Sequence, residues 1–176
     1  MATQVLEQKL ARHFELLDID GDGYIERSDI TTFAERICQA GGVAASSPEG
    51  QKVVQQGERL WQALQQSMDL DSDEQVSRSE FVEAADVERV MRQAIQLGVA
   101  AFEVMDGDRD GRISRDEWTR TDEQLGVALA DSRKGFGQLD QDNDGYVTKA
   151  EFTEGLEEFY RSADASAPGN WAFGKF

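Results

Sequence analysis

Hydrophobic residues recur at helical spacing on either side of four short acidic stretches. Before the first stretch, four apolar residues share one helix face because they lie three or four positions apart: Leu6, Leu10, Phe14 and Leu17. Before the third and fourth stretches, the same spacing gives Ile95, Val99, Phe102, Met105, Leu129, Phe136 and Leu139. One apolar residue follows each stretch at once: Ile30, Phe81, Trp118 and Phe152. The pattern predicts a helix on both sides of each stretch, packed around a core.

A segment rich in Gly, Ser and Pro interrupts this pattern at residues 41–50, GGVAASSPEG. Residues of these types end helices and form turns. The segment therefore predicts a linker after the helix that follows the first acidic stretch. A long helix is predicted next, from about Val53 to Met68, with apolar positions at Leu60, Trp61 and Leu64.

The C-terminal residues 166–176 lose the helical period around Pro168 and Gly169. Three aromatic residues nevertheless follow closely: Trp171, Phe173 and Phe176. Such a tail can fray, as many chain ends do. Burial of an aromatic side chain stabilises a folded protein by about 2 kcal/mol relative to leaving it exposed. We therefore expect the tail instead to cover an apolar cleft between the protein's own helices.

The four acidic stretches share one twelve-residue pattern. They are loop one (18–29, DIDGDGYIERSD), loop two (69–80, DLDSDEQVSRSE), loop three (106–117, DGDRDGRISRDE) and loop four (140–151, DQDNDGYVTKAE). Each has Asp at positions one, three and five, a β-branched residue at position eight and a carboxylate at position twelve. Position six is Gly in three of them: Gly23, Gly111 and Gly145. Fixed spacing of this kind indicates a repeated helix–loop–helix unit.

Oxygen-bearing residues at this spacing suit Ca²⁺, which takes six to eight oxygen ligands. Positions one, three and five direct side-chain oxygens inward, position seven supplies its backbone carbonyl, position nine acts through water, and position twelve supplies two oxygens. Position six needs a positive φ, which Gly adopts at little cost. Ser or Thr at position nine with Glu at position twelve also has the spacing of a capping box. The apolar residue at position eight predicts that loops pair through a short antiparallel bridge.

Loops three and four match this pattern at every position, and we predict a calcium ion in each. Loop one departs from it at position twelve, where Asp29 is one methylene shorter than Glu, and it has Glu26 at position nine. The shorter side chain shifts the preference toward the smaller Mg²⁺. We still predict a calcium site there, with Mg²⁺ as a competitor.

Loop two has the carboxylates but carries Glu74 at position six. A positive φ at a residue other than Gly costs on the order of 1 kcal/mol. The helix before loop two also has Gln65 where the other three units have Phe. Two interpretations remain open: a fourth metal site, or a loop that only serves as a pairing partner.

With these loops, the long interval between the first two, the Asp29 ending of loop one and the aromatic tail, the chain resembles the calerythrin and sarcoplasmic calcium-binding protein family, in its prokaryotic branch. The resemblance covers nearly the whole chain. It implies a compact all-α fold of four EF-hand units, paired one with two and three with four, and a calcium-buffering function. The implied metal ligands are Asp18, Asp20, Asp22, Tyr24, Glu26, Asp29, Asp106, Asp108, Asp110, Arg112, Ser114, Glu117, Asp140, Asp142, Asp144, Tyr146, Thr148 and Glu151. The corresponding residues of loop two are Asp69, Asp71, Asp73, Gln75 and Glu80, although the second hand of this family is often silent.

We expect three segments: a first EF-hand pair at 1–92, a second pair at 93–165 and the tail at 166–176. Asp and Glu number 35 against 18 Lys and Arg, which gives a net charge of −17. This charge opposes binding to nucleic acid and to anionic membranes. A secretory signal and an apolar run of the ~20 residues needed for a membrane span are both absent. We therefore predict a cytoplasmic, monomeric protein.

Catalytic motifs are absent, and we predict that the protein is not an enzyme. Cys38 is the only cysteine, so an internal disulfide and a Cys-based zinc site are excluded. His13 is the only histidine, and its charged neighbours place it on an exposed helix surface. Calcium sensors open Met-rich grooves for target helices, whereas this chain has only four Met. The predicted function is a calcium buffer that binds three or four ions; the alternative is a sensor that regulates a partner protein.

Overall fold

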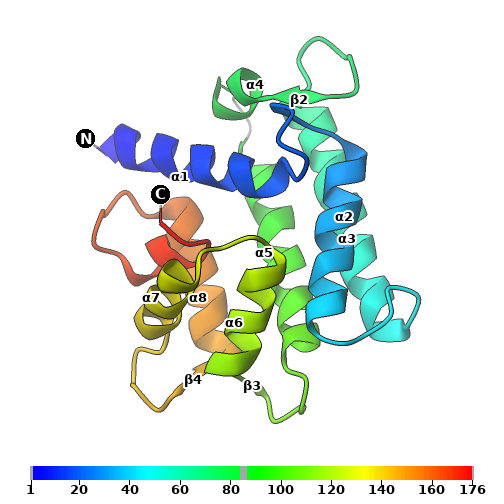
Figure 1. The fold of residues 1–176 in the computed structure, drawn as a ribbon. Coiled ribbons are helices and arrows are strands. Elements are labelled where there is room, and N and C mark those ends of the chain that lie inside the picture. The colour runs from blue at the N-terminus through cyan, green and yellow to red at the C-terminus, as the bar shows by residue number, and fades with distance from the viewer. Residues whose placement is uncertain (1, 84–86, 176) are drawn as a thin grey trace.

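The computed structural model describes residues 2–83 and 87–175 and is mostly helical (Figure 1). Its first half contains α1 (Ala2–Leu17), β1 (Tyr24–Ile25), α2 (Arg27–Ala40), α3 (Pro48–Met68), β2 (Val76–Ser77) and α4 (Arg78–Glu83). Its second half contains α5 (Val87–Met105), β3 (Arg112–Ser114), α6 (Arg115–Gln124), α7 (Leu129–Leu139), β4 (Tyr146–Thr148), α8 (Lys149–Arg161) and the 3-10 helix η1 (Pro168–Trp171). The predicted all-α fold of four helix–loop–helix units is confirmed.

Short antiparallel strands join the loops in the expected pairs. β1 pairs with β2 through Ile25 and Val76, and β3 pairs with β4 through Ile113 and Val147. These four side chains occupy position eight of their loops and are fully buried. Each bridge thus lies directly on the core. The two loop pairs lie at opposite ends of the molecule (Figure 1).

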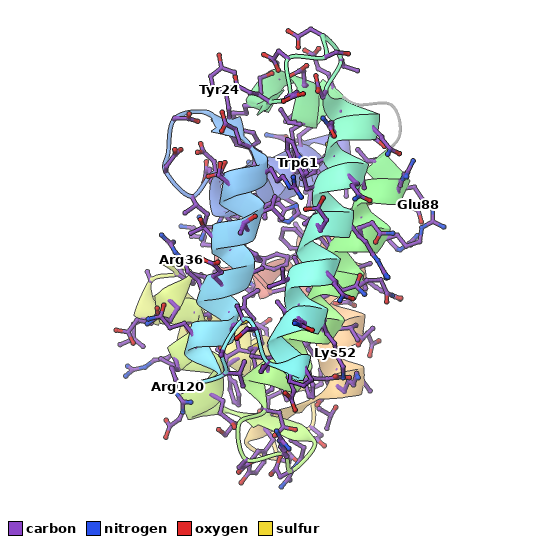
Figure 2. All side chains as sticks on the ribbon, turned by 90° about the vertical axis from the view of Figure 1, so that its right-hand side faces the viewer. Tyr24, Arg36, Lys52, Trp61, Glu88 and Arg120 are labelled. Atoms are coloured by element: carbon purple, nitrogen blue, oxygen red, sulfur yellow. The ribbon has the colours of Figure 1, made fainter. Side chains whose placement is uncertain are left out.

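One continuous apolar core connects the two pairs of units. The residues that follow the loops, Ile30, Phe81, Trp118 and Phe152, are all buried in it. α3 packs along both α2 and α5, and Figure 2 shows α2 and α3 side by side. Loop two and α4 separate α3 from α5 in the sequence, so the core forms between segments distant along the chain. The division at residues 92 and 93 remains a prediction.

The long helix α3 begins five residues before the predicted Val53, at Pro48. Ser47 is its N-cap: the Ser47 hydroxyl accepts a hydrogen bond from the Gly50 backbone N–H at 3.0 Å. Pro at the first helical position fits the same arrangement, because its missing N–H would have had no partner there. Of the predicted linker 41–50, the last three residues therefore belong to the helix.

Leu129 was wrongly assigned to the core by its spacing. It is 50% exposed, because it is the first residue of α7 and lies where the chain is still turning into the helix. The remaining apolar positions of that segment, Phe136 and Leu139, are fully buried as predicted.

His13 was wrongly predicted to lie at the surface, since its side chain is only 3% exposed. Its ring packs against Phe81, Phe159 and Phe173, and its Nε2 lies 3.1 Å from the Tyr160 hydroxyl. Burial lowers the His13 pKa to about 3, which keeps the imidazole neutral at neutral pH. The error arises because α1 is covered on a second side by α8 and the tail.

Lys9, one turn before His13, is also buried, with 1% exposure. Its Nζ donates to the backbone carbonyls of Glu158 at 3.2 Å and Ser162 at 2.7 Å. These carbonyls lie at the C-terminal end of α8, where a cation interacts favourably with the helix dipole. Lys9 thus fastens α1 to the end of α8.

The aromatic tail packs on α7 and α8 through η1 and reaches α1. Phe173 stacks on His13 with ring centroids 5.5 Å apart, and its carbonyl accepts from Arg12 Nε at 3.1 Å. A Cβ at Gly135 of α7 would lie 2.6 Å from the Trp171 carbonyl oxygen, so this approach requires glycine. Phe176 lies outside the described residues. The described part of the tail covers apolar surface of the protein itself, as its composition predicts.

The buried Asp122 of α6 gives a testable dependence of stability on pH. It is 8% exposed, and burial raises its pKa to about 7 against the opposing influence of Ser132 and Trp118. An acid whose pKa is raised by folding binds a proton more tightly when folded, so stability falls as pH rises from about 4 to 7. We expect Asp122→Asn to remove this fall and to stabilise the protein at pH 8 by up to about 4 kcal/mol.

Urea unfolding of calcium-free protein at pH 5 and pH 8 measures the effect. The matched control is Glu123→Gln, which removes the adjacent, exposed carboxylate of the same helix. Equal stability of wild type and Asp122→Asn at pH 8 would contradict the prediction.

Candidate metal centre

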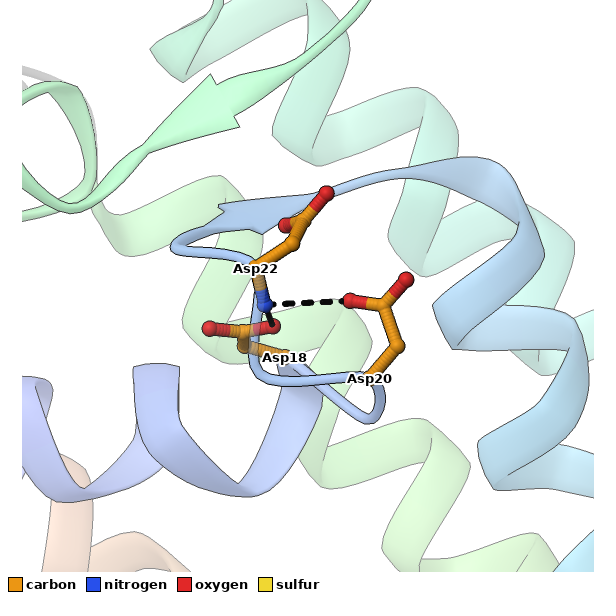
Figure 3. A group of neighbouring side chains, drawn as sticks. All are labelled: Asp18, Asp20 and Asp22. Carbon is orange, nitrogen blue, oxygen red and sulfur yellow. Dashed lines mark hydrogen bonds between the residues drawn. The ribbon is translucent and has the colours of Figure 1, made fainter.

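Three carboxylates converge in each of the four loops. In every group, one oxygen from each carboxylate lies within 4.8 Å of the others. The groups are Asp18, Asp20 and Asp22; Asp69, Asp71 and Asp73; Asp106, Asp108 and Glu117; and Asp140, Asp142 and Glu151. Figure 3 shows the loop-one group around the backbone N–H of Asp22, which donates to Asp18 at 3.1 Å and Asp20 at 3.2 Å. The structure thus brings together most of the aspartates predicted as ligands.

Backbone N–H groups hold these carboxylates in place. In loop three, the Asp106 carboxylate accepts from the N–H groups of Asp110 and Gly111, at 3.1 and 2.9 Å. Asp110 in turn accepts from the Arg112 N–H at 2.9 Å. The position-five carboxylate accepts from the position-seven N–H at 2.9 Å in the other loops as well. The loop backbone therefore contributes to fixing the ligand directions.

The carboxylate at position twelve closes each loop in the same way. It accepts from the position-nine N–H at 2.8 Å in all four loops. Its other oxygen accepts from the position-two N–H at 2.8–3.2 Å. Asp29 reaches both groups despite its shorter side chain. The three predicted capping boxes are present: the hydroxyls of Ser77, Ser114 and Thr148 accept from the N–H groups of Glu80, Glu117 and Glu151.

Position twelve is electrostatically different in loop one. Burial raises the pKa of Asp29 above its ordinary value, and two backbone hydrogen bonds only partly oppose this. For Glu117, burial also raises the pKa, but hydrogen bonds from Ser114 and from backbone N–H groups outweigh it and leave the pKa below its ordinary value. The pKa values of Glu80 and Glu151 are lowered in the same way.

Loop four contains a buried oxygen that lacks a protein partner. Asp140 is 5% exposed, and among the described residues its Oδ1 accepts no hydrogen bond. A buried carboxylate oxygen without a partner is costly. A cation held with Asp142 and Glu151 would supply the missing interaction, so this donor set fits a hard divalent ion.

Some predicted ligands instead contact other residues of the loops. The Glu26 carboxylate accepts a hydrogen bond from the Gln75 amide of loop two at 2.5 Å. Ser114 and Thr148, at position nine, donate to the position-twelve glutamates of their own loops at 2.7 Å. The carbonyls of Tyr24, Arg112 and Tyr146 remain predicted ligands. The cross-loop contact of Glu26 was missed because loop pairing decides it.

Loop two adopts the same conformation as the other loops despite Glu74. The φ of Glu74 is +66°, against +92° for Gly23, +87° for Gly111 and +88° for Gly145. Its N–H donates to Asp69 at 3.2 Å, as the glycines do in their loops. The predicted backbone strain is therefore present, and the carboxylates still converge.

Relief of this strain should strengthen metal binding by loop two. We expect Glu74→Gly to increase the affinity of that loop by about 1 kcal/mol, roughly fivefold, because Gly adopts positive φ without steric cost. Calcium titration by calorimetry measures it. Glu74→Ala is the matched control, because it removes the charge but keeps Cβ. An equal gain in both variants, or in neither, would show that strain does not limit this loop.

Comparison with known proteins agrees with the four helix–loop–helix units of the structure. The EF-hand domain pair family matches residues 7–85, and the EF hand family matches residues 99–120 and 133–156. A calcium-binding protein from Streptomyces coelicolor, described in the context of prokaryotic calcium-mediated regulation, is 32% identical, with a TM-score of 0.78. The match covers 91% of this chain and 99% of that one.

Two more distant proteins share the fold. The sarcoplasmic calcium-binding protein from amphioxus is 19% identical, with a TM-score of 0.72 and coverage of 98% of both chains. The magnesium-loaded ctenophore photoprotein berovin is 21% identical, with a TM-score of 0.67 and coverage of 86% of both chains. In the part of the chain that the structure describes, every helix is too short or too polar to cross a membrane.

Proposed function

We propose that this chain, which belongs to the EF-hand calcium-binding proteins, is a cytoplasmic calcium buffer. It resembles the sarcoplasmic and prokaryotic members of that family. In this proposal loops one, three and four each hold an ion through the ligands predicted from the sequence, and loop two is a possible fourth site. Residues 1–92 and 93–165 act as its two EF-hand pairs. It is proposed to be monomeric and without catalytic activity.

The observation that best supports metal binding is the buried Asp140 Oδ1 beside Asp142 and Glu151, which finds no hydrogen-bond partner in the part of the chain that the structure describes. A bound calcium ion would neutralise the converging carboxylates and draw the position-twelve residue into its ligand shell. In loop one, the short Asp29 supports additional use of Mg²⁺, an ion that berovin binds in all three of its calcium-binding loops.

The tail supports a buffer over a sensor. A sensor must expose an apolar groove to a target when calcium binds. Here Ala172 and Phe173 line an apolar cavity of about 60 Å³ together with His13 and Tyr160, so the protein's own C-terminus covers part of the apolar surface between the helices.

A regulatory role is the second candidate. It is favoured by the similarity to the Streptomyces coelicolor protein, which is described in terms of calcium-mediated regulation. That protein and this chain match over almost their full lengths. Regulation requires a calcium-dependent change in exposed surface, and this requirement separates the two candidates.

Calorimetric calcium titration with and without magnesium, combined with fluorescence of a hydrophobic dye, tests the proposal. A buffer is expected to bind three or four calcium ions with little change in dye fluorescence. A large calcium-dependent increase in dye binding by the intact protein would favour the regulatory role. Two or fewer ions at millimolar calcium would remove loop one from the proposed sites.

A further inference from the structure

Arg112, at position seven of loop three, places a positive charge between two loops. Its Nη2 donates to Asp110 Oδ2 at 3.0 Å, within its own loop. Its Nη1 lies 3.9 Å from Asp144 Oδ2 in loop four. The guanidinium also lies 3.9 Å from the centroid of the Tyr146 ring, on the strand paired with its own. Stacking on an aromatic ring holds such a cation in a defined direction.

The other position-seven residues are uncharged: Tyr24, Gln75 and Tyr146. Among the ion pairs formed by the described residues, only those of Arg112 involve proposed metal ligands. The neighbouring Arg109, at position four of the same loop, instead pairs with Glu49 of α3 at 3.3 Å. Besides Arg115 at position ten, loop three therefore has two arginines of equal charge: Arg112 contacts the proposed ligands and Arg109 does not.

We infer that Arg112 is a built-in cation that opposes calcium binding in loops three and four and so lowers the affinity of both. Two effects act in the same direction. Without calcium, the guanidinium reduces the mutual repulsion of the loop carboxylates, which stabilises the metal-free form. With calcium bound, the same charge, which lies beside Asp110 and Asp144, would repel the ions. This inference rests on the proposed ligands Asp110 and Asp144.

The inference is tested by measuring calcium affinity through competition with a chromophoric chelator, at low and at high salt. The variants compared with wild type are Arg112→Gln, Arg112→Lys and Arg109→Gln. We expect Arg112→Gln to bind calcium in loops three and four roughly three- to tenfold more tightly than wild type at low salt. The gain should shrink in high salt, because the side chain is partly exposed and salt screens its charge. Arg112→Lys keeps the charge, so its gain should be smaller than that of Arg112→Gln. Arg109→Gln leaves the contact intact and should stay near wild type.

An unchanged or reduced affinity in Arg112→Gln overturns the inference. An equal gain in Arg109→Gln also overturns it, since net charge alone would then explain the effect, and so does an equal gain in Arg112→Lys. The ¹³C signals of the side-chain carboxyls provide a separate readout in metal-free protein: those of Asp110 and Asp144 should shift in Arg112→Gln and not in Arg109→Gln.

A wrong assignment of the metal ligands can be distinguished from a wrong role of Arg112. If Glu117→Gln leaves the calcium stoichiometry unchanged, the ligand assignment in loop three is wrong. If Glu117→Gln removes an ion but Arg112→Gln does not change affinity, the ligands hold and only the role of Arg112 is wrong.

Discussion

Deletion of residues 170–176 is expected to lower the melting temperature of the calcium-loaded protein by roughly 10 °C, which corresponds to a loss of 3–4 kcal/mol for a chain of this size. The deletion removes the Phe173 ring, which contacts His13, Phe159 and Tyr160. It also removes the carbonyl that accepts from Arg12. Thermal unfolding followed by circular dichroism measures the effect.

The same deletion should increase binding of a hydrophobic dye, because the cavity behind Ala172 and Phe173 loses its cover. Lys175→Ala, which truncates an exposed side chain of the same segment, is the control and should change neither quantity. If the intact calcium-loaded protein already binds dye strongly and the deletion changes little, the tail does not cover the cleft. That result would favour a calcium-dependent regulator.

Glu117→Gln and Glu151→Gln are each expected to remove one calcium ion from the titration. Each substitution replaces a carboxylate that can supply two charged oxygens with a neutral amide that has one. In the structure, Glu117 and Glu151 each converge with the first two aspartates of their loops. Calorimetry on the two variants and on the double variant gives the stoichiometry, with two ions lost from the double variant.

Matched controls for these substitutions are Glu123→Gln on α6 and Glu154→Gln on α8, which remove exposed carboxylates away from the loops. Both controls should bind the wild-type number of ions. Full stoichiometry in Glu151→Gln at sub-millimolar calcium would show that position twelve does not close loop four.

The amino-acid sequence by itself determined the loops. All the residues that shape one loop lie within twelve positions, so their spacing fixes which oxygens converge. The buried residues at position eight, such as Ile25 and Val147, indicate that loops pair, whereas the pairing of one with two and three with four was implied by the family resemblance. The positive φ of Glu74 followed in the same way, because the turn at position six depends on its own loop.

Only the tertiary structure decided how the helices share their surfaces. The period of α1 shows one apolar face, yet His13 and Lys9 are buried because α8 and the tail cover a second face. The contacts of Gln75 with Glu26 and of Arg112 with Asp144 exist only once two loops are paired. The local sequence pattern indicates which side chains of a segment can be buried. Which other segment buries them depends on packing between segments that are far apart in the chain.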